Sequence, residues 1–230
     1  MYQVPRIPEL ARRERFIRRA AAERVAYVVS DGREIVQIDA HGQPPAPVAL
    51  MWSSRHEAER WSGVLAERPT VEAIGLGALL DQLLPRLGER GIAVGLDWTC
   101  DTVEPEIEPT DLAGRLRMEM LEIFVHKVQA AGRMWILEGS DGPARLAGHD
   151  EGTVALACWG EAGLAEAAVA GDWSGMRVLE IPLAGFRAMT VPWLDSRGWK
   201  IAAEPASPHA AAEIAPAVLL LRLSRETGPV

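Results

Sequence analysis

The sequence predicts an α+β protein made of two similar tandem modules, each with a small mixed or antiparallel sheet of about four strands covered by helices. Three observations lead to this prediction: residues that recur in one register, an Asp-Gly hairpin signal in each half, and a leucine stripe with helical spacing. We place the copies at 12–117 and 118–225, with tails at 1–11 and 226–230. A chain of 230 residues, 48% of them hydrophobic, is long enough for two compact cores.

The repeat becomes visible when the second half is moved back by 107 positions. Trp159 then falls on Trp52, and seven further identities lie in one gapless window. In that window the first copy contributes Val71, Ile74, Leu76, Pro85, Leu87, Arg90 and Gly91, and the second contributes Val178, Ile181, Leu183, Pro192, Leu194, Arg197 and Gly198. Nearer the start the shift becomes 108, which brings Phe124 onto Phe16. A register held along the whole copy indicates a duplication.

The first elements of each copy follow from apolar spacing. Residues 12–22 have the pattern of an amphipathic helix. The runs RVAYVVS and REIVQID follow, and the Asp31-Gly32 pair between them predicts a hairpin. PVALMW is expected to form a third strand that ends at Trp52, and Ser53 or Ser54 is expected to cap a helix through Arg60.

The leucine stripe predicts a core-facing helix, because its residues recur at i, i+3, i+4 and i+7. Pro85 lies late in this helix and has no N–H for the carbonyl of residue 81, so we expect a kink or a break there. Gly91 and Gly198 are expected to be left-handed C-terminal caps before the last strand of each copy, IAVGLDW and WKIAAEP.

The segment that joins the copies contains no helix breaker after Gly114. Residues 109–131 therefore predict one long helix or two joined helices. A stiff bridge favours a fixed arrangement of the copies over two freely moving domains. Packing of one copy on the other would then mimic a two-fold dimer.

Composition argues against two classes of partner. The formal net charge of −8 disfavours general nucleic-acid binding. The longest apolar runs, such as AVLLL, are too short to span a membrane, and the first residues lack the features of a signal peptide, so we expect a cytoplasmic protein. An arginine-rich stretch near the start and an acidic stretch near the middle are expected to be solvated; the alternative is a docking pair for a partner or for the other half.

No catalytic, metal-binding or cofactor-binding pattern is found. The five histidines have no metal-ligand spacing, and neither a P-loop nor a nucleophile elbow occurs. Cys100 is the most reactive-looking thiol, but Asp97 and Asp101 flank it, and carboxylates disfavour the thiolate. Cys158 lies in an apolar run and is expected to be buried. We therefore predict no catalytic residue, no metal and no cofactor.

Tryptophan is unusually frequent, with eight residues in the chain. Two of them mark differences between the copies, because Trp193 stands where the first copy has Arg86, and Trp199 stands where it has Ile92. Exposed tryptophan together with arginine is typical of protein interfaces. We therefore predict an interaction surface made of Arg86, Trp193, Trp199 and Trp173; the alternative is that these indoles pack within the protein.

The order of elements, with the motifs LACW, GDW, VLEIPLAGF and VPWLDSRG, resembles the bacterial family called domain of unknown function 2750. The resemblance implies a tandem duplication of a domain that usually occurs once. The first copy departs from the pattern, with LAERP in place of the Asp-Trp pair, and both copies lack the proline expected after the third-strand tryptophan. A more distant likeness is to SseB-like proteins of type III secretion. Neither family supplies catalytic residues to carry over.

These observations favour a non-enzymatic protein-interaction or regulatory module of a bacterial cytoplasm, with a possible protein partner and with neither nucleic acid nor membrane. Two alternatives stay open. One is an immunity or antitoxin-like protein that blocks a basic effector through charge complementarity. The other is an enzyme with an unrecognised site near Asp97, Cys100 and Asp101.

Overall fold

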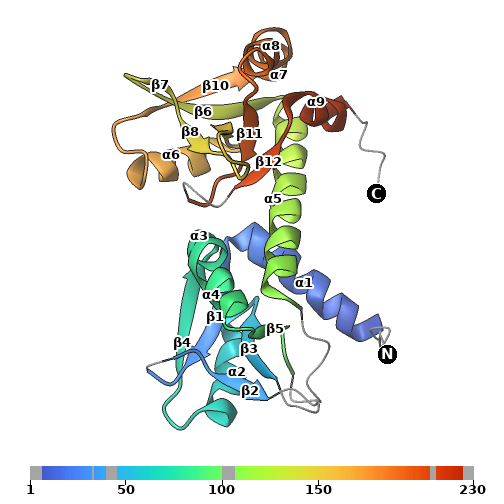
Figure 1. Ribbon diagram of the computed structural model, residues 1–230, viewed down its shortest axis with the longest axis vertical. Coiled ribbons are helices and arrows are strands. Elements are labelled where there is room, and N and C mark those ends of the chain that lie inside the picture. Colours follow the sequence, from blue (N-terminus) through green and yellow to red (C-terminus); the bar gives the residue numbers. More distant parts are fainter. Residues whose placement is uncertain (1–6, 33, 40–45, 100–106, 208–210, 225–230) are drawn as a thin grey trace. The chain divides into compact units, whose positions relative to one another are not determined.

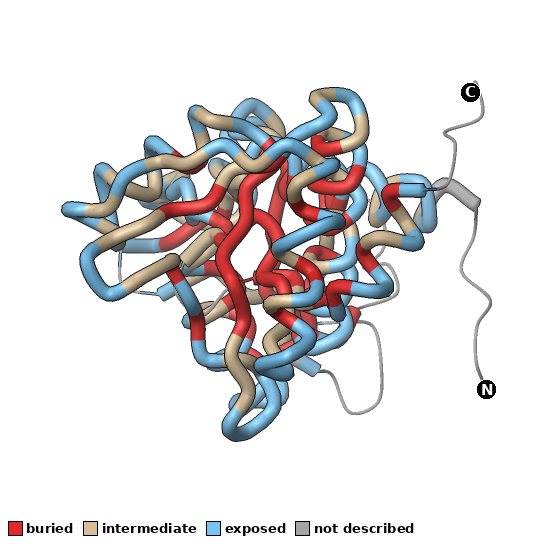
Figure 2. The backbone as a smooth tube through the Cα atoms, turned by 90° about the horizontal axis from the view of Figure 1, so that it is seen from above, coloured by how far each residue is buried: buried red, intermediate tan, exposed pale blue. Residues whose placement is uncertain are grey.

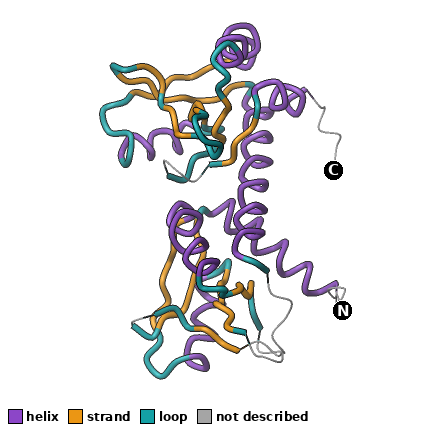
Figure 3. Tube along the Cα trace, in the orientation of Figure 1, coloured by secondary structure: helices purple, strands orange, loops and turns teal. Residues whose placement is uncertain are grey.

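The computed structural model describes residues 7–32, 34–39, 46–99, 107–207 and 211–224. The chain divides into two compact units, Met1–Glu119 and Met120–Val230 (Figure 1). Each unit combines helices with strands, which form one five-stranded mixed sheet in the first unit and a three-stranded antiparallel and a four-stranded mixed sheet in the second (Figure 3). This confirms the predicted α+β class and the two similar modules.

The first unit contains a five-stranded sheet in which β3 is central. β3 pairs in parallel with β5 and antiparallel with β1 and β2, and β4 pairs antiparallel with β1. Its elements are α1 (Ile7–Glu23), β1 (Val25–Ser30), β2 (Gln37–Asp39), β3 (Pro47–Trp52), α2 (Arg55–Leu65), β4 (Thr70–Gly75), α3 (Leu76–Ala78), the π-helical segment η1 (Leu79–Leu83), α4 (Leu84–Glu89) and β5 (Ala93–Leu96). Helix α5 (Pro109–Ala131) is continuous and crosses the boundary between the units at Glu119.

The second unit repeats this order. β9 pairs in parallel with β11 and antiparallel with β8, β10 pairs with β6, and β11 also pairs with β12. Its elements are β6 (Arg133–Gly139), β7 (Gly142–Pro143), β8 (Arg145–Ala147), β9 (Val154–Cys158), α6 (Ala162–Ala170), β10 (Arg177–Pro182), α7 (Leu183–Gly185), the π-helical segment η2 (Phe186–Thr190), α8 (Val191–Asp195), β11 (Lys200–Ala203), β12 (Ala212–Ile214) and α9 (Pro216–Ser224).

The strand beside β3 is interrupted by a short excursion. Val28 pairs with Met51 and Gln37 pairs with Ala49, so β3 advances by two residues while its neighbour advances by nine. Seven residues are therefore looped out beside the third strand. They contain the predicted Asp31-Gly32 turn, and Gly32 has the positive φ of 88° that such a turn requires. The predicted hairpin is reduced to one bridge, Ser30–Ile35, because β1 and β2 both pair with β3 instead of with each other.

The second unit has the same excursion at the equivalent place. The bridge between Trp135 and Trp159 and the pair Arg145–Leu156 lie three residues apart on β9 and ten residues apart on its neighbour. The excess is again seven residues. The identical irregularity shows that the duplicated sequence has kept its backbone geometry as well as its core.

The core of each unit lies on the inner strands, where Figure 2 shows the buried residues concentrated. Trp52 and Trp159, at corresponding ends of the third strands, are fully buried, as are Phe16 and Phe124 on the preceding helices. One buried indole removes on the order of 200 Å² from water, which is worth roughly 5 kcal/mol before entropy is counted. The residues aligned by the repeat are therefore mainly core residues.

The predicted kink at proline is a π-helical segment in both units. The Leu84 N–H donates to the carbonyl of Leu79, and the Val191 N–H donates to that of Phe186, so the residue before each proline bonds five residues back. In an α-helix the proline ring would crowd the carbonyl four residues earlier. A wider π-turn relieves that crowding without ending the helix.

The predicted serine cap is replaced by a different contact. Ser54 stands at the N-cap of α2, as predicted, but its side chain makes no capping hydrogen bond. The Ser53 hydroxyl instead donates to Oδ2 of Asp97 at 3.0 Å, because that carboxylate lies buried beside it.

Asp97 closes the first unit at the end of β5. Its side chain is 2% exposed, and its Oδ1 accepts the backbone N–H of Ser53, the residue after Trp52, at 2.7 Å. Nε of Arg15, on α1, donates to Oδ2 at 2.9 Å. One carboxylate thus links the third strand, the last strand and the first helix.

Glu204 has the same role in the second unit. Its Oε1 accepts the backbone N–H of Gly160, the residue after Trp159, at 3.0 Å, and Lys127 of α5 lies 3.6 Å away. Asp97 and Glu204 also share a positive φ, 46° and 49°, which few non-glycine residues adopt. The longer glutamate and the shorter aspartate therefore reach equivalent backbone groups from equivalent turns.

We expect Asp97→Ala to lower the free energy of unfolding by about 2–3 kcal/mol, because two buried donors of Ser53 lose their acceptor. Asp97→Asn should cost less, about 1–2 kcal/mol, since its amide oxygen still accepts the Ser53 N–H and asparagine tolerates positive φ, while the hydrogen bond with Arg15 is lost. Urea denaturation followed by circular dichroism measures both. Equal losses for the two variants would contradict this role of the carboxylate.

Gly91 and Gly198 adopt φ of 65° and 64°, which confirms the predicted left-handed caps. A Cβ on Gly91 would meet nothing within 4 Å, so Gly91→Ala should destabilise the fold by about 1 kcal/mol through backbone strain alone. Gly63 provides the matched control, because it lies inside α2 with equally open surroundings. Gly63→Ala should stabilise by about 0.5–1 kcal/mol, and thermal denaturation of both variants checks the opposite signs.

Candidate interaction surface

Two tryptophans and two arginines form a stacked cluster on the second unit, which we call the Arg-Trp cluster: Arg145, Trp193, Arg197 and Trp199. The rings of Trp193 and Trp199 meet edge to face with centroids 5.0 Å apart. The Arg197 guanidinium lies 4.4 Å from the Trp193 ring centroid, and that of Arg145 lies 6.0 Å from the Trp199 ring centroid. The structure thus brings together the two tryptophans that differ between the copies.

Local backbone geometry holds these side chains in place. Trp193 lies on α8, and the turn that follows reverses the chain at Gly198, whose positive φ permits the reversal. The Trp199 N–H then donates to the carbonyl of Leu194 at 3.0 Å, which fixes the second indole beside α8. The Ser196 hydroxyl donates to the Trp193 carbonyl at 2.8 Å.

Arg145 reaches the cluster from the sheet. It begins β8 and pairs with Leu156 of β9, which pairs in turn with Ile201 of β11. Trp199 directly precedes β11. Both indoles are half-buried, whereas Arg145 and Arg197 are exposed, so each arginine covers part of an indole and keeps its polar groups in water.

The first unit has different chemistry at the same positions. Arg86, on α4, is exposed, and Ile92 is buried at 2% exposure. The pairings Gln37–Ala49 and Arg145–Leu156 place Gln37 where the second unit has Arg145. Arg90, the counterpart of Arg197, lies 3.9 Å from the carboxylate of Glu34 instead of over an indole.

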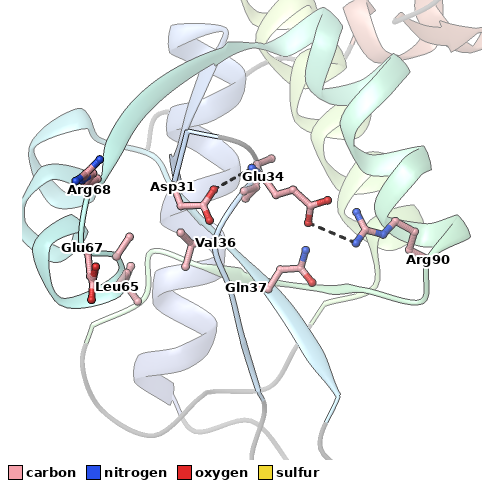
Figure 4. Close-up of a pocket in the computed structure, with 10 residues that line it drawn as sticks. Asp31, Glu34, Val36, Gln37, Leu65, Glu67, Arg68 and Arg90 are labelled. Carbon is pink, nitrogen blue, oxygen red and sulfur yellow. Dashed lines mark hydrogen bonds and ion pairs between the residues drawn. The ribbon is translucent and has the colours of Figure 1, made fainter.

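Beside these residues the first unit has an open groove of about 580 Å³ (Figure 4). Figure 4 shows Glu34 and Arg90 facing each other across one end, while the Glu34 N–H donates to Oδ1 of Asp31 at 3.0 Å. The groove is lined by Asp31, Glu34, Ile35, Val36, Gln37, Leu65, Ala66, Glu67, Arg68 and Arg90. Its charges are mixed, and none of the described lining residues is aromatic. The region beside the end of α4 is therefore polar in the first unit, whereas the corresponding region beside α8 is aromatic in the second.

Trp173, the fourth residue of the predicted surface, is half-buried like Trp193 and Trp199, but it packs against the core of the second unit rather than on the Arg-Trp cluster. Its ring meets Trp159 edge to face at 5.6 Å and contacts the core around Leu146 and Ala155. Its counterpart in the first unit is Ala66, while Trp61 on α2 corresponds to Ala168 on α6. The first unit thus has a tryptophan within α2, whereas the second unit has one just after α6.

Sequence reasoning did not identify Arg145 and Arg197 as members of the cluster. Arg197 aligns with an identical residue, Arg90, in the first copy, so the sequence comparison gave no sign that the two arginines have different surroundings. Arg145 stands opposite Gln37 only after the shift of 108 is applied through the hairpin. That difference between the copies is the signal that could have identified it.

A second polar group near β11 is a network of surface ion pairs. Nζ of Lys200 lies 2.6 Å from Asp150 and 3.3 Å from Glu213. The hydrogen bond with Lys200 lowers the pKa of Asp150, and the same bond raises the pKa of Lys200. Both shifts favour the charged forms at neutral pH, as expected for an exposed pair.

The thiol of Cys158 is fully buried in β9, and burial raises its pKa, because desolvation disfavours the thiolate. Cys100 lies outside the described residues, as do the acidic residues Asp101, Glu104 and Glu106. Within the described ranges, no three His, Cys, Asp or Glu side chains gather in a way that could hold a metal ion. No helix in the described part of the chain is both long enough and apolar enough to cross a bilayer.

Comparison with known proteins identifies the repeated unit. The family model described as "Protein of unknown function (DUF2750)" matches the chain twice, at residues 13–116 and 121–223. The more distant SseB-like resemblance stays a prediction. No curated protein matches.

Two solved structures are similar over most of the chain. "Anabaena Tic22 (protein transport)" is 10% identical with a TM-score of 0.27, over 79% of this chain and 89% of that one. "Tic22 from Plasmodium falciparum" is 8% identical with a TM-score of 0.25, over 79% of this chain and 97% of that one. Likeness at these TM-scores carries no argument about fold or role.

Burial of Cys158 makes a direct prediction about reactivity. In a Cys100→Ser background, we expect a thiol reagent such as Ellman's reagent to label the folded protein at least about a hundredfold more slowly than the protein in guanidinium, since labelling requires opening of the unit. Absorbance of the released thiolate measures both rates. Rapid stoichiometric labelling of the folded chain would show that Cys158 is accessible.

Proposed function

The chain belongs to the DUF2750 family through both of its halves, and we propose that it is a non-enzymatic protein-interaction module whose partner binds the Arg-Trp cluster of the second unit. We further propose that this partner is a protein, that neither nucleic acid nor membrane is bound, and that the protein works in a bacterial cytoplasm.

The observation that carries the proposal is the stacking of Trp193 and Trp199 with two arginines on one face of the second unit. Tryptophan and arginine are the residues most enriched at the energetic centres of protein interfaces. A half-buried indole is already fixed by its own module, so a partner that covers it gains apolar burial at a low entropic cost.

The duplication supports a role beyond folding. The same backbone in the first unit is stable with Arg86 and Ile92, so the fold does not require tryptophan at either position. The two units have kept one skeleton and acquired different chemistry at one end of it. A partner that binds the second unit accounts for indoles that the skeleton does not need.

The residues of the first unit at the two tryptophan positions provide the test. We expect the double substitution Trp193→Arg with Trp199→Ile, which installs the residues of the first unit, to leave the fold intact and to abolish retention of a partner. Loss of two such indoles should weaken binding by at least about a hundredfold, from about 2 kcal/mol for each. Affinity capture on the tagged full-length protein from its host, followed by calorimetry with the captured partner, measures the effect.

Arg86→Ala is the matched control, because it removes the exposed side chain at the equivalent position of the first unit. This variant should bind like the parent protein. A partner that binds the double variant as tightly as the parent would exclude the Arg-Trp cluster as its site. Circular dichroism of each variant separates lost binding from lost folding.

A further inference from the structure

We infer that the partner segment covering the Arg-Trp cluster is acidic, with protein carboxylates set against the guanidinium edges of Arg145 and Arg197. This inference rests on the proposed function and names the chemistry of the partner. Its basis is the charge pairing and the stacking geometry of the second unit.

Most basic side chains of the second unit already have carboxylate partners. Arg133 lies 3.0 Å from Glu180, and the other pairs are Arg177 with Glu138, Arg222 with Glu122, Lys127 with Glu161 and Glu204, and Lys200 with Asp150 and Glu213. Among the residues that the structure describes, Arg145 and Arg197 have no ion-pair partner. Each lies over one indole, and Arg197 also donates to the Ser196 hydroxyl at 3.5 Å. Two guanidinium groups without a carboxylate partner, one over each ring of a single indole pair, are unexpected in a chain of net charge −8.

Stacking leaves the hydrogen-bonding capacity of each arginine available. A guanidinium that lies over an indole contacts it through its face, while its N–H donors point outward in the plane of the group. Such an edge matches a carboxylate, which can accept two parallel hydrogen bonds. The indole also restricts the arginine, so less side-chain freedom is lost when a carboxylate binds.

An acidic polypeptide fits this surface better than a nucleic acid. Binding a phosphate backbone draws on many cations, whereas the cluster offers two in a protein with 32 acidic and 24 basic side chains. The indoles are also engaged with each other and with the arginines, which leaves less of their faces for stacking bases. A protein segment with alternating carboxylate and apolar groups would meet both parts of the cluster.

The first unit does not repeat this cluster at the equivalent positions. The corresponding residues there are Gln37, Arg86 and Ile92, and Arg90 faces Glu34 at 3.9 Å. Its own indole pair, Trp61 and Trp98, has one arginine, Arg60, 5.2 Å from the Trp61 ring centroid. The inference therefore concerns the second unit, where two arginines flank one indole pair.

The test follows the indole N–H signals of the full-length protein by ¹H–¹⁵N NMR during titration with hexaglutamate. We expect saturable shifts of the Trp193 and Trp199 signals, with the Trp52 and Trp159 signals unchanged because those rings are buried. Raising the salt from 50 to 500 mM should weaken binding at least about fivefold, since exposed ion pairs are screened. Arg145→Met with Arg197→Met should weaken it at least about tenfold.

Arg187→Met is the charge control for each single substitution, Arg145→Met and Arg197→Met. Arg187 is exposed on η2 and lies over no indole among the described residues, and its loss removes one positive charge, as each single substitution does. This variant should retain binding within about twofold. Hexalysine and hexaserine should leave the Trp193 and Trp199 signals unmoved.

Three results would overturn the inference. They are the absence of shifts with hexaglutamate, equal shifts with hexaserine, and larger Arg145- and Arg197-dependent shifts with an oligouridylate, which would assign the cluster to single-stranded RNA.

The two proposals fail separately. A captured partner that needs Trp193 and Trp199 but tolerates both arginine substitutions and high salt would keep the interaction role and remove the acidic partner. If hexaglutamate bound at the cluster but no partner were captured, the affinity for acidic segments would stand and the proposed interaction role would fall.

Discussion

A buried carboxylate at the end of the last parallel strand holds each module together. Asp97 and Glu204 leave their strands with positive φ and turn inward to accept the N–H that follows the third-strand tryptophan. That single acceptor satisfies a buried donor, fixes the two parallel strands at the same end, and provides a counter-charge for the preceding helix. The carboxylate therefore anchors the backbone directly after the buried tryptophan of each module.

The two modules separate scaffold from surface. Their strands, their seven-residue excursions and their π-helical segments coincide, whereas the residues over the end of α4 and α8 do not. In the first unit that region borders a groove of mixed charge, and in the second it carries paired indoles under arginine. Both copies must satisfy the same folding requirements. Residues that differ between them at this end of the module are therefore not required by the shared fold.

The parts of the fold that the sequence predicted are those set by local chemistry. Asp31-Gly32 made the turn, Gly91 and Gly198 made the caps, and Pro85 disturbed its helix, because each of these residues restricts its own backbone wherever it occurs. The π-segment was not anticipated, since the backbone can avoid a proline clash by ending the helix as well as by widening it.

The buried carboxylates were missed for another reason: one copy has aspartate and the other glutamate, so an identity match does not align them. The site was half predictable. Trp193 and Trp199 stood out as differences between the copies, but stacking by Arg145 depends on the pairing of strands distant in sequence. Trp173 gave the same compositional signal as they did and is equally half-buried, but it packs beside Trp159, because the neighbours of a side chain are decided by other elements of the fold.

Helix α5 has a consequence for how the protein must be divided. Its first half provides Leu112 and Leu116 to the buried residues of the first unit, and its second half provides Phe124 and Val128 to those of the second. A helix forms cooperatively, so fraying that begins in one half lowers the stability of the other. A protease cut near Glu119 would therefore remove part of the buried core from each unit at once.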